Sequence, residues 1–90
     1  MNILYEEITI KNEQGLHARP AALFVEIVNK YNINVRVRKK DLTVDGKSIM
    51  GLLMLEAGKG TKVELIIEGK EAEAALKEFK ELLKDEHISE

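Results

Sequence analysis

The 90-residue sequence has no cysteine and no tryptophan, and only two histidines. Without cysteine the chain cannot form a disulfide scaffold, an iron–sulfur cluster held by thiolates or a thiol nucleophile. A zinc site built around two histidines would depend on carboxylates, so we expect neither a metal site nor a cofactor. The histidines are His17 and His87, and His87 lies in a polar tail where we expect it to be solvated.

Long apolar runs are also absent, since no stretch of the chain approaches the ~20 residues that cross a bilayer. The N-terminal segment has neither the basic flank nor the long apolar core of a signal peptide. We therefore expect a cytoplasmic protein that does not insert into membranes.

Neither sign of charge dominates the composition: 14 basic residues stand against 16 acidic ones, for a formal net charge of -2. A general nucleic-acid binder needs a basic surface, so we expect no nucleic-acid partner. A hydrophobic content of 44% is ordinary for a globular protein. The length predicts that residues 1–90 form a single domain.

The spacing of apolar residues predicts strands and helices in alternation. A period of two indicates strands over residues 3–11, 33–39, 42–44 and 63–67. Apolar stripes at helical spacing indicate helices over residues 20–29, 49–55 and 72–83. Every strand then has one apolar face and every helix one apolar stripe, so the simplest arrangement is an antiparallel sheet with all the helices on one side. The expected fold class is α+β, in the order βαββαβα.

The residues with the clearest chemical potential follow the first strand, in the run Gly15-Leu16-His17-Ala18-Arg19-Pro20. A helix start has unpaired N–H groups and a partial positive charge, and both suit a bound phosphate. Gly15 allows a tight turn that brings His17 to the surface, where a neutral imidazole nitrogen is a competent nucleophile toward phosphorus. Arg19 adds a permanent charge with a fork of donors. By position alone, an equally simple interpretation makes His17 a surface or capping residue and Arg19 a solvated charge.

The segment Gly15–Ala21 resembles the active-site signature of HPr, the family of histidine-containing phosphocarriers of the bacterial phosphoenolpyruvate-dependent sugar phosphotransferase system. A second segment, Lys47–Gly51, is similar to the regulatory serine site of that family. The length, the order of elements and the turn Lys59–Thr61 also match, so the resemblance covers nearly the whole chain. It implies an open-faced β-sandwich, with a four-stranded antiparallel sheet and three helices on one face.

The resemblance implies a phosphoryl carrier that is not a stand-alone enzyme. Enzyme I would phosphorylate Nδ1, the pros nitrogen, of His17, and the protein would pass the phosphoryl group to the A domain (EIIA) of a sugar permease. Arg19 would stabilise the phosphoryl group, and the helix start at Ala18 and Pro20 would cradle it. A carrier that moves between partners works best as a monomer, so we expect a monomer.

Ser48 has two interpretations. Its place before a short apolar segment is typical of a helix N-cap, which contributes ~1 kcal/mol. The resemblance adds phosphorylation by an HPr kinase/phosphorylase and binding of the modified form to a catabolite-control repressor. The segment after Ser48 has more apolar residues than one side of a short helix can bury, which is typical of a docking surface. The residues that we expect to dock partners are Leu16, Ile49, Met50 and Leu53.

Three alternatives to a sugar-system carrier stay open. The first is a regulatory HPr paralogue that acts mainly through Ser48 and protein contacts, although such a copy would not need His17. The second is a nitrogen-type carrier without a sugar permease as acceptor. The third is a small ferredoxin-like nucleic-acid-binding domain, against which the acidic balance and the 4% aromatic content argue.

Overall fold

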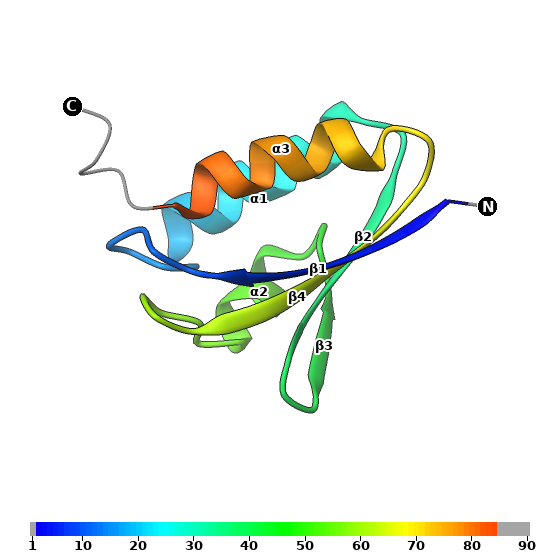
Figure 1. Cartoon of the computed structure of the whole chain (residues 1–90). Coiled ribbons are helices and arrows are strands. Elements are labelled where there is room, and N and C mark those ends of the chain that lie inside the picture. The colour runs from blue at the N-terminus through cyan, green and yellow to red at the C-terminus, as the bar shows by residue number, and fades with distance from the viewer. Residues whose placement is uncertain (1, 85–90) are drawn as a thin grey trace.

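The described chain folds in the order βαββαβα, as the sequence predicted (Figure 1). The computed structural model describes residues 2–84, so His87 lies outside the described residues. The elements are β1 (Ile3–Thr9), α1 (Ala18–Lys30), β2 (Asn34–Lys39), β3 (Leu42–Asp45), α2 (Ile49–Met54), β4 (Lys62–Glu68) and α3 (Ala72–Leu83).

The four strands form one antiparallel sheet in the order β1-β4-β2-β3. The register places Leu4 of β1 and Val35 of β2 on either side of Ile67 in β4. Because side chains alternate along a strand, these three residues and their neighbours two positions away lie on the same face. Val63, Leu65 and Ile67 are buried there, which confirms the predicted alternation.

The helices and the apolar face of the sheet enclose one hydrophobic core. The helices α1 and α3 lie side by side over the sheet (Figure 1). Phe24 of α1 stacks on Phe79 of α3 with 4.3 Å between the ring centroids. The short helix α2 packs against α1 and β3 and contributes Leu52 to the same core. Burial of a side chain of this size stabilises the fold by ~2–3 kcal/mol.

The opposite face of the sheet is open and largely polar. Arg36, Arg38 and Thr43 are exposed there, and Arg38 forms an ion pair with Glu64 of the neighbouring strand. Tyr5 is 62% exposed on the same face. Among residues 2–84, no helix is long and apolar enough to span a bilayer.

The end of β1 differs slightly from the predicted strand over residues 3–11. The strand ends at Thr9, although the N–H of Ile10 still donates to the carbonyl oxygen of Thr61 at 2.8 Å. At Lys11 the chain leaves the sheet, because the N–H of this residue donates to the carbonyl oxygen of Leu83 at the end of α3. This change of direction begins the loop that leads to His17.

Candidate functional site

The loop between β1 and α1 ends in a tight turn that packs against the segment after α2. Gly15 has a φ of +59°, and a Cβ atom there would lie 2.5 Å from the carbonyl oxygen of Ala57. The backbone conformation and the available space therefore both require glycine. The N–H of Leu16 donates to the same carbonyl oxygen at 2.9 Å. These contacts fix the point at which the chain enters α1.

His17 is the N-cap residue of α1 and is exposed, as the sequence predicted. Its backbone is extended, with φ of -78° and ψ of -172°, and its side chain makes no capping hydrogen bond. The carbonyl oxygen of His17 accepts the first helical hydrogen bond, from the N–H of Ala21 at 2.8 Å. The backbone of His17 is thus held by the helix while its imidazole ring is directed to solvent.

The first turn of α1 offers backbone donors to an anion. The N–H groups of Ala18 and Arg19 make no hydrogen bond within residues 2–84, as the geometry of a helix start requires. The helix dipole adds partial positive charge at this end, and the first turn contains no acidic residue. Pro20 is buried and lacks an N–H group, so it shapes the helix start, whereas Ala18 can donate a hydrogen bond.

Arg19 is exposed beside this helix start. None of the ion pairs formed within residues 2–84 includes its guanidinium group. The group is therefore available for a phosphate or for a partner protein, and its forked donors match two phosphate oxygens.

Leu16 does not lie on the surface, so the expectation that it docks partners is wrong. Its side chain is 2% exposed and belongs to the hydrophobic core. The physical reason is the turn itself, because the hydrogen bond from Leu16 to Ala57 holds the residue inward. Leu16 anchors the segment that presents His17, which is a structural role.

The other predicted docking residues are exposed on α2. The Oγ atom of Ser48 accepts a hydrogen bond from the N–H of Gly51 at 2.9 Å, so Ser48 caps this helix as predicted. Beyond the cap, four large apolar side chains reach solvent while Leu52 is buried. These four residues form what we call the α2 patch, with exposed fractions of 40% for Ile49, 71% for Met50, 36% for Leu53 and 63% for Met54.

Two residues that hold the site were not predicted from the sequence. The Nζ atom of Lys39 donates to the carbonyl oxygens of Leu55 at 2.9 Å and Glu56 at 3.3 Å, and so caps the end of α2. Nothing in the local sequence indicates this contact, because the partners are far apart in the chain. Asn12 is buried and bonds to Gly15. Its position at the start of a polar four-residue turn that ends in Gly15 is a signal that could have identified it.

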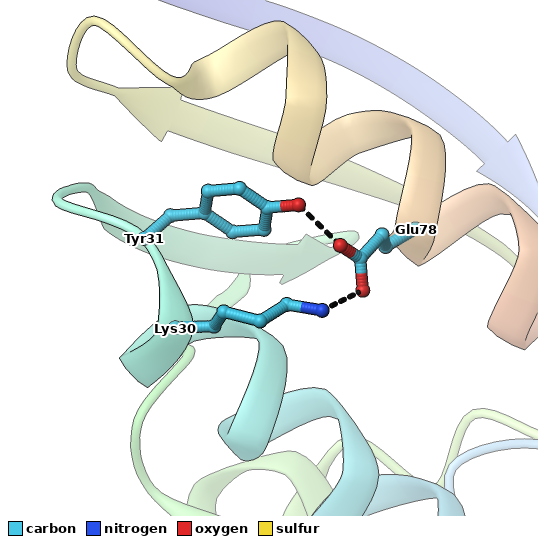
Figure 2. A network of polar contacts seen from close by, with 3 residues as sticks. All are labelled: Lys30, Tyr31 and Glu78. Carbon is cyan, nitrogen blue, oxygen red and sulfur yellow. Dashed lines mark hydrogen bonds and ion pairs between the residues drawn. The ribbon is translucent and has the colours of Figure 1, made fainter.

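The far end of α1 holds a second polar cluster (Figure 2). Glu78 of α3 accepts hydrogen bonds from the Nζ atom of Lys30, at 2.7 Å, and from the hydroxyl group of Tyr31. These two hydrogen bonds hold the pKa of Glu78 below its usual value. The hydrogen bond to Glu78 likewise raises the pKa of Lys30 and of Tyr31. The cluster ties α1 to α3.

No group of residues in the described range 2–84 has the composition of a metal site.

Comparisons with known proteins agree with this geometry. Residues 4–85 match the family model described as the phosphorylation site of the HPr component of the phosphotransferase system. The chain is 51% identical to the phosphocarrier protein HPr of Pseudomonas aeruginosa, over 86% of this chain and 87% of that protein. It is 36% identical to the HPr-like protein Crh of Bacillus subtilis, over 93% of this chain and 99% of that protein. The crystal structure of a phosphocarrier protein HPr from Bacillus anthracis superposes with a TM-score of 0.85 at 34% identity, covering 91% of this chain and 98% of that one.

An open-faced β-sandwich with an exposed histidine at the start of its first helix defines a class of small phosphocarrier proteins. Within that class the chain belongs to the HPr family, the phosphocarriers of the bacterial phosphotransferase system. This membership sets aside the ferredoxin-like nucleic-acid-binding alternative.

Proposed function

We propose that this protein accepts a phosphoryl group from enzyme I on Nδ1 of His17 and passes it to the A domain of a sugar permease. The observation that carries the proposal is the exposed, uncapped imidazole of His17 at a helix start whose first N–H groups have no partner within residues 2–84. The family match supports the same assignment.

The transfer needs one nucleophile and no metal ion from this chain. The lone pair of Nδ1 attacks the phosphorus atom of the phosphoryl group on enzyme I, and a P–N bond forms at His17. The bond between phosphorus and the donor atom of enzyme I breaks at the same time, and its electron pair stays with that donor atom. The reverse sequence at the acceptor releases His17 with its lone pair restored.

The surroundings of His17 stabilise the transferred group by charge and by hydrogen bonds. The N–H groups of Ala18 and Arg19 point from the positive end of the helix dipole and suit the phosphoryl oxygens. The guanidinium group of Arg19 adds a charge-assisted contact to the same oxygens in each complex. Pro20 contributes by fixing the first helical turn.

The α2 patch supplies the docking surface in this proposal. Its exposed side chains, Ile49, Met50 and Leu53 among them, lie on a helix that packs directly against α1. Methionine side chains are flexible and polarizable, which suits a surface that must fit a donor and several acceptors in turn. The chain then acts as a monomeric, cytoplasmic carrier, with residues 1–90 as one domain.

A labelling experiment tests the phosphocarrier assignment. The protein is incubated with phosphoenolpyruvate and enzyme I, and the adduct is measured by intact mass and by its lability in acid. We expect one acid-labile phosphoryl group on the wild-type protein and on His87→Ala, and none on His17→Ala. Labelling of His17→Ala to the wild-type level would refute the assignment.

A second proposed role is regulation through Ser48. An HPr kinase/phosphorylase would transfer the γ-phosphoryl group of ATP to its Oγ atom, with ADP as the leaving group and the hydroxyl proton lost to a base. The modification adds ~2 negative charges next to Ile49 and Met50. This charge would repel an acidic partner from the α2 patch and recruit a basic one, such as a catabolite-control repressor. The similarity to Crh supports this role.

The Ser48 role has its own test, independent of His17. Incubation with ATP and an active HPr kinase should give an acid-stable adduct on the wild-type protein and on Ser89→Ala, and none on Ser48→Ala. Absence of an adduct from the wild-type protein would remove the regulatory role. If the Ser48 adduct forms but enzyme I does not label His17, the protein is instead a regulatory paralogue. If His17 is labelled but the A domains of sugar permeases do not accept its phosphoryl group, the protein is a nitrogen-type carrier.

A further inference from the structure

Among residues 2–84, Asn12 is the only polar or charged residue that is buried, with 6% of its surface exposed. It lies in the loop between β1 and α1, five positions before His17. Every other buried side chain with a large volume in this part of the chain is apolar, including Ile10 and Leu16. A buried amide among such neighbours needs a physical reason, because removing it from water is unfavourable unless it is hydrogen-bonded.

The amide of Asn12 closes the turn that leads to His17. Its Nδ2 atom donates to the carbonyl oxygen of Gly15 at 3.0 Å. The N–H of Gly15 donates back to the carbonyl oxygen of Asn12 at 3.2 Å. Two hydrogen bonds therefore join the same pair of residues, and they hold both polar groups of Gly15.

The backbone of Asn12 also anchors this turn to the third helix. Its N–H donates to the carbonyl oxygen of Leu83 at 3.2 Å, and the N–H of Lys11 donates to the same oxygen at 2.8 Å. Leu83 is the last residue of α3 and is buried. The turn is thus fixed at one side by α3 and, through the bond from Leu16 to Ala57, at the other side by the segment after α2.

Burial of the second polar atom of the Asn12 side chain opposes folding. Its Oδ1 atom is buried and has no hydrogen-bond partner within residues 2–84, and an unmatched buried acceptor destabilises a fold. An apolar side chain of similar size would avoid this cost. What an apolar side chain cannot do is hold the carbonyl group of Gly15, two positions before His17.

We infer that Asn12 is a positioning residue for phosphoryl transfer, because its amide fixes the turn that aims His17 and the first N–H groups of α1. This inference rests on the proposed phosphocarrier function. Asn12 touches neither the phosphoryl group nor a partner protein; it acts through Gly15. A small misplacement of a reacting group slows a reaction strongly. The α2 patch lies on a separate helix, so we expect docking to be affected much less.

The test compares Asn12→Ala with a variant that weakens the fold elsewhere. Val28→Ala removes buried volume in the C-terminal half of α1 and leaves the turn intact. Both variants are assayed with phosphoenolpyruvate and enzyme I well below their unfolding temperatures. We expect Asn12→Ala to lower kcat about tenfold with KM unchanged, and Val28→Ala to keep both constants.

A spectroscopic readout accompanies the kinetics. In ¹⁵N–¹H correlation spectra, Asn12→Ala should shift the amide signals of residues 15–18, and Val28→Ala should leave them in place. Asn12→Ser keeps a short hydroxyl donor, so its kcat should lie between those of the wild type and Asn12→Ala. This milder variant decides the question if Asn12→Ala does not fold.

The outcomes separate this inference from the function on which it rests. If the wild-type protein is labelled on His17 while the Asn12 variants keep the wild-type kcat and amide signals, the positioning role is wrong and the carrier function stands. An equal loss of kcat in Asn12→Ala and Val28→Ala would assign Asn12 a purely structural role and also overturn the inference. If enzyme I does not label the wild-type protein, the carrier function itself fails.

Discussion

The polar groups at the two ends of α1 differ in whether they have hydrogen-bond partners within the protein. At the N-terminal end, the imidazole of His17, the guanidinium group of Arg19 and the first N–H groups have no partner within residues 2–84. At the C-terminal end, Lys30 and Tyr31 both bond to Glu78, and the helix is tied to α3 (Figure 2). One end is left open to solvent, as the proposed carrier function requires, and the other end is bonded internally. One helix can therefore combine an unpartnered end with an anchored end. Substitutions at the first end should affect transfer, and substitutions at the second should affect stability.

The largest effect is expected at the turn before the N-terminal end of α1, which we call the open end. Gly15→Ala places a Cβ atom against the carbonyl oxygen of Ala57 and forces alanine into a φ of +59°. We expect it to lower the free energy of unfolding by about 2–4 kcal/mol and to abolish efficient transfer. Chemical denaturation and the enzyme I assay measure the two effects.

Gly58→Ala is the matched control for that substitution. A Cβ atom at Gly58 meets nothing within 4 Å, so stability should change by less than about 0.5 kcal/mol. Equal stability of the two variants would show that the turn does not need glycine at position 15.

At the open end itself, Arg19→Ala should separate function from stability. Loss of the charge-assisted contact is expected to lower kcat/KM for phosphoryl transfer by about 10- to 100-fold. The free energy of unfolding should change by less than about 0.5 kcal/mol, because the side chain is exposed. Arg36→Ala, an exposed arginine on the open face of the sheet, should leave transfer unchanged. The assignment of Arg19 fails if both variants transfer at the wild-type rate.

At the C-terminal end of α1, which is bonded internally and which we call the closed end, substitution should lower stability without lowering transfer. Glu78→Gln removes the carboxylate that accepts from Lys30 and Tyr31, so the midpoint of thermal unfolding should fall slightly while transfer from enzyme I stays within about twofold of the wild type. Glu73→Gln, which replaces an exposed glutamate in the first turn of α3, should leave transfer unchanged. A marked loss of transfer in Glu78→Gln would mean that the two ends of α1 are coupled.

The smallest expected effect is the pH dependence of this closed end. The pKa of Glu78 is lower in the folded protein than its ordinary value of 4.5, so its stabilising contribution is present above that pH and is lost as the pH falls through the folded value. The raised pKa values of Lys30 and Tyr31 act at the other limit, and their contribution is lost as the pH rises through the folded values. The stability difference between the wild type and Glu78→Gln should therefore shrink in acid and in strong alkali, and a difference constant from pH 2 to 12 would contradict the role of the cluster.

The regular elements were predictable from the sequence because their apolar residues follow one period. The alternation of Val63, Leu65 and Ile67 and the stripe through α3 needed no knowledge of distant contacts. The open end of α1 was also predictable, since the signals for a helix start and for a turn at Gly15 are local. Exposure of the apolar residues of α2 followed from their excess over what a short helix buries.

The features that the sequence did not reveal depend on contacts between distant segments. Leu16 is buried because its N–H bonds to Ala57, which lies more than 40 positions away. Lys39 caps α2 from the neighbouring hairpin, and Glu78 meets Lys30 from another helix. No local pattern specifies which of many lysines and glutamates will meet in this way, so these contacts became visible only in the folded chain.

The most direct test of the carrier account is NMR of the protein after phosphorylation by enzyme I. We expect ³¹P–¹⁵N coupling to Nδ1 of His17, together with downfield shifts of the amide protons of Ala18 and Arg19 as they bond to the phosphoryl oxygens. Coupling to Nε2, or a phosphoryl group on any other residue, would contradict the account.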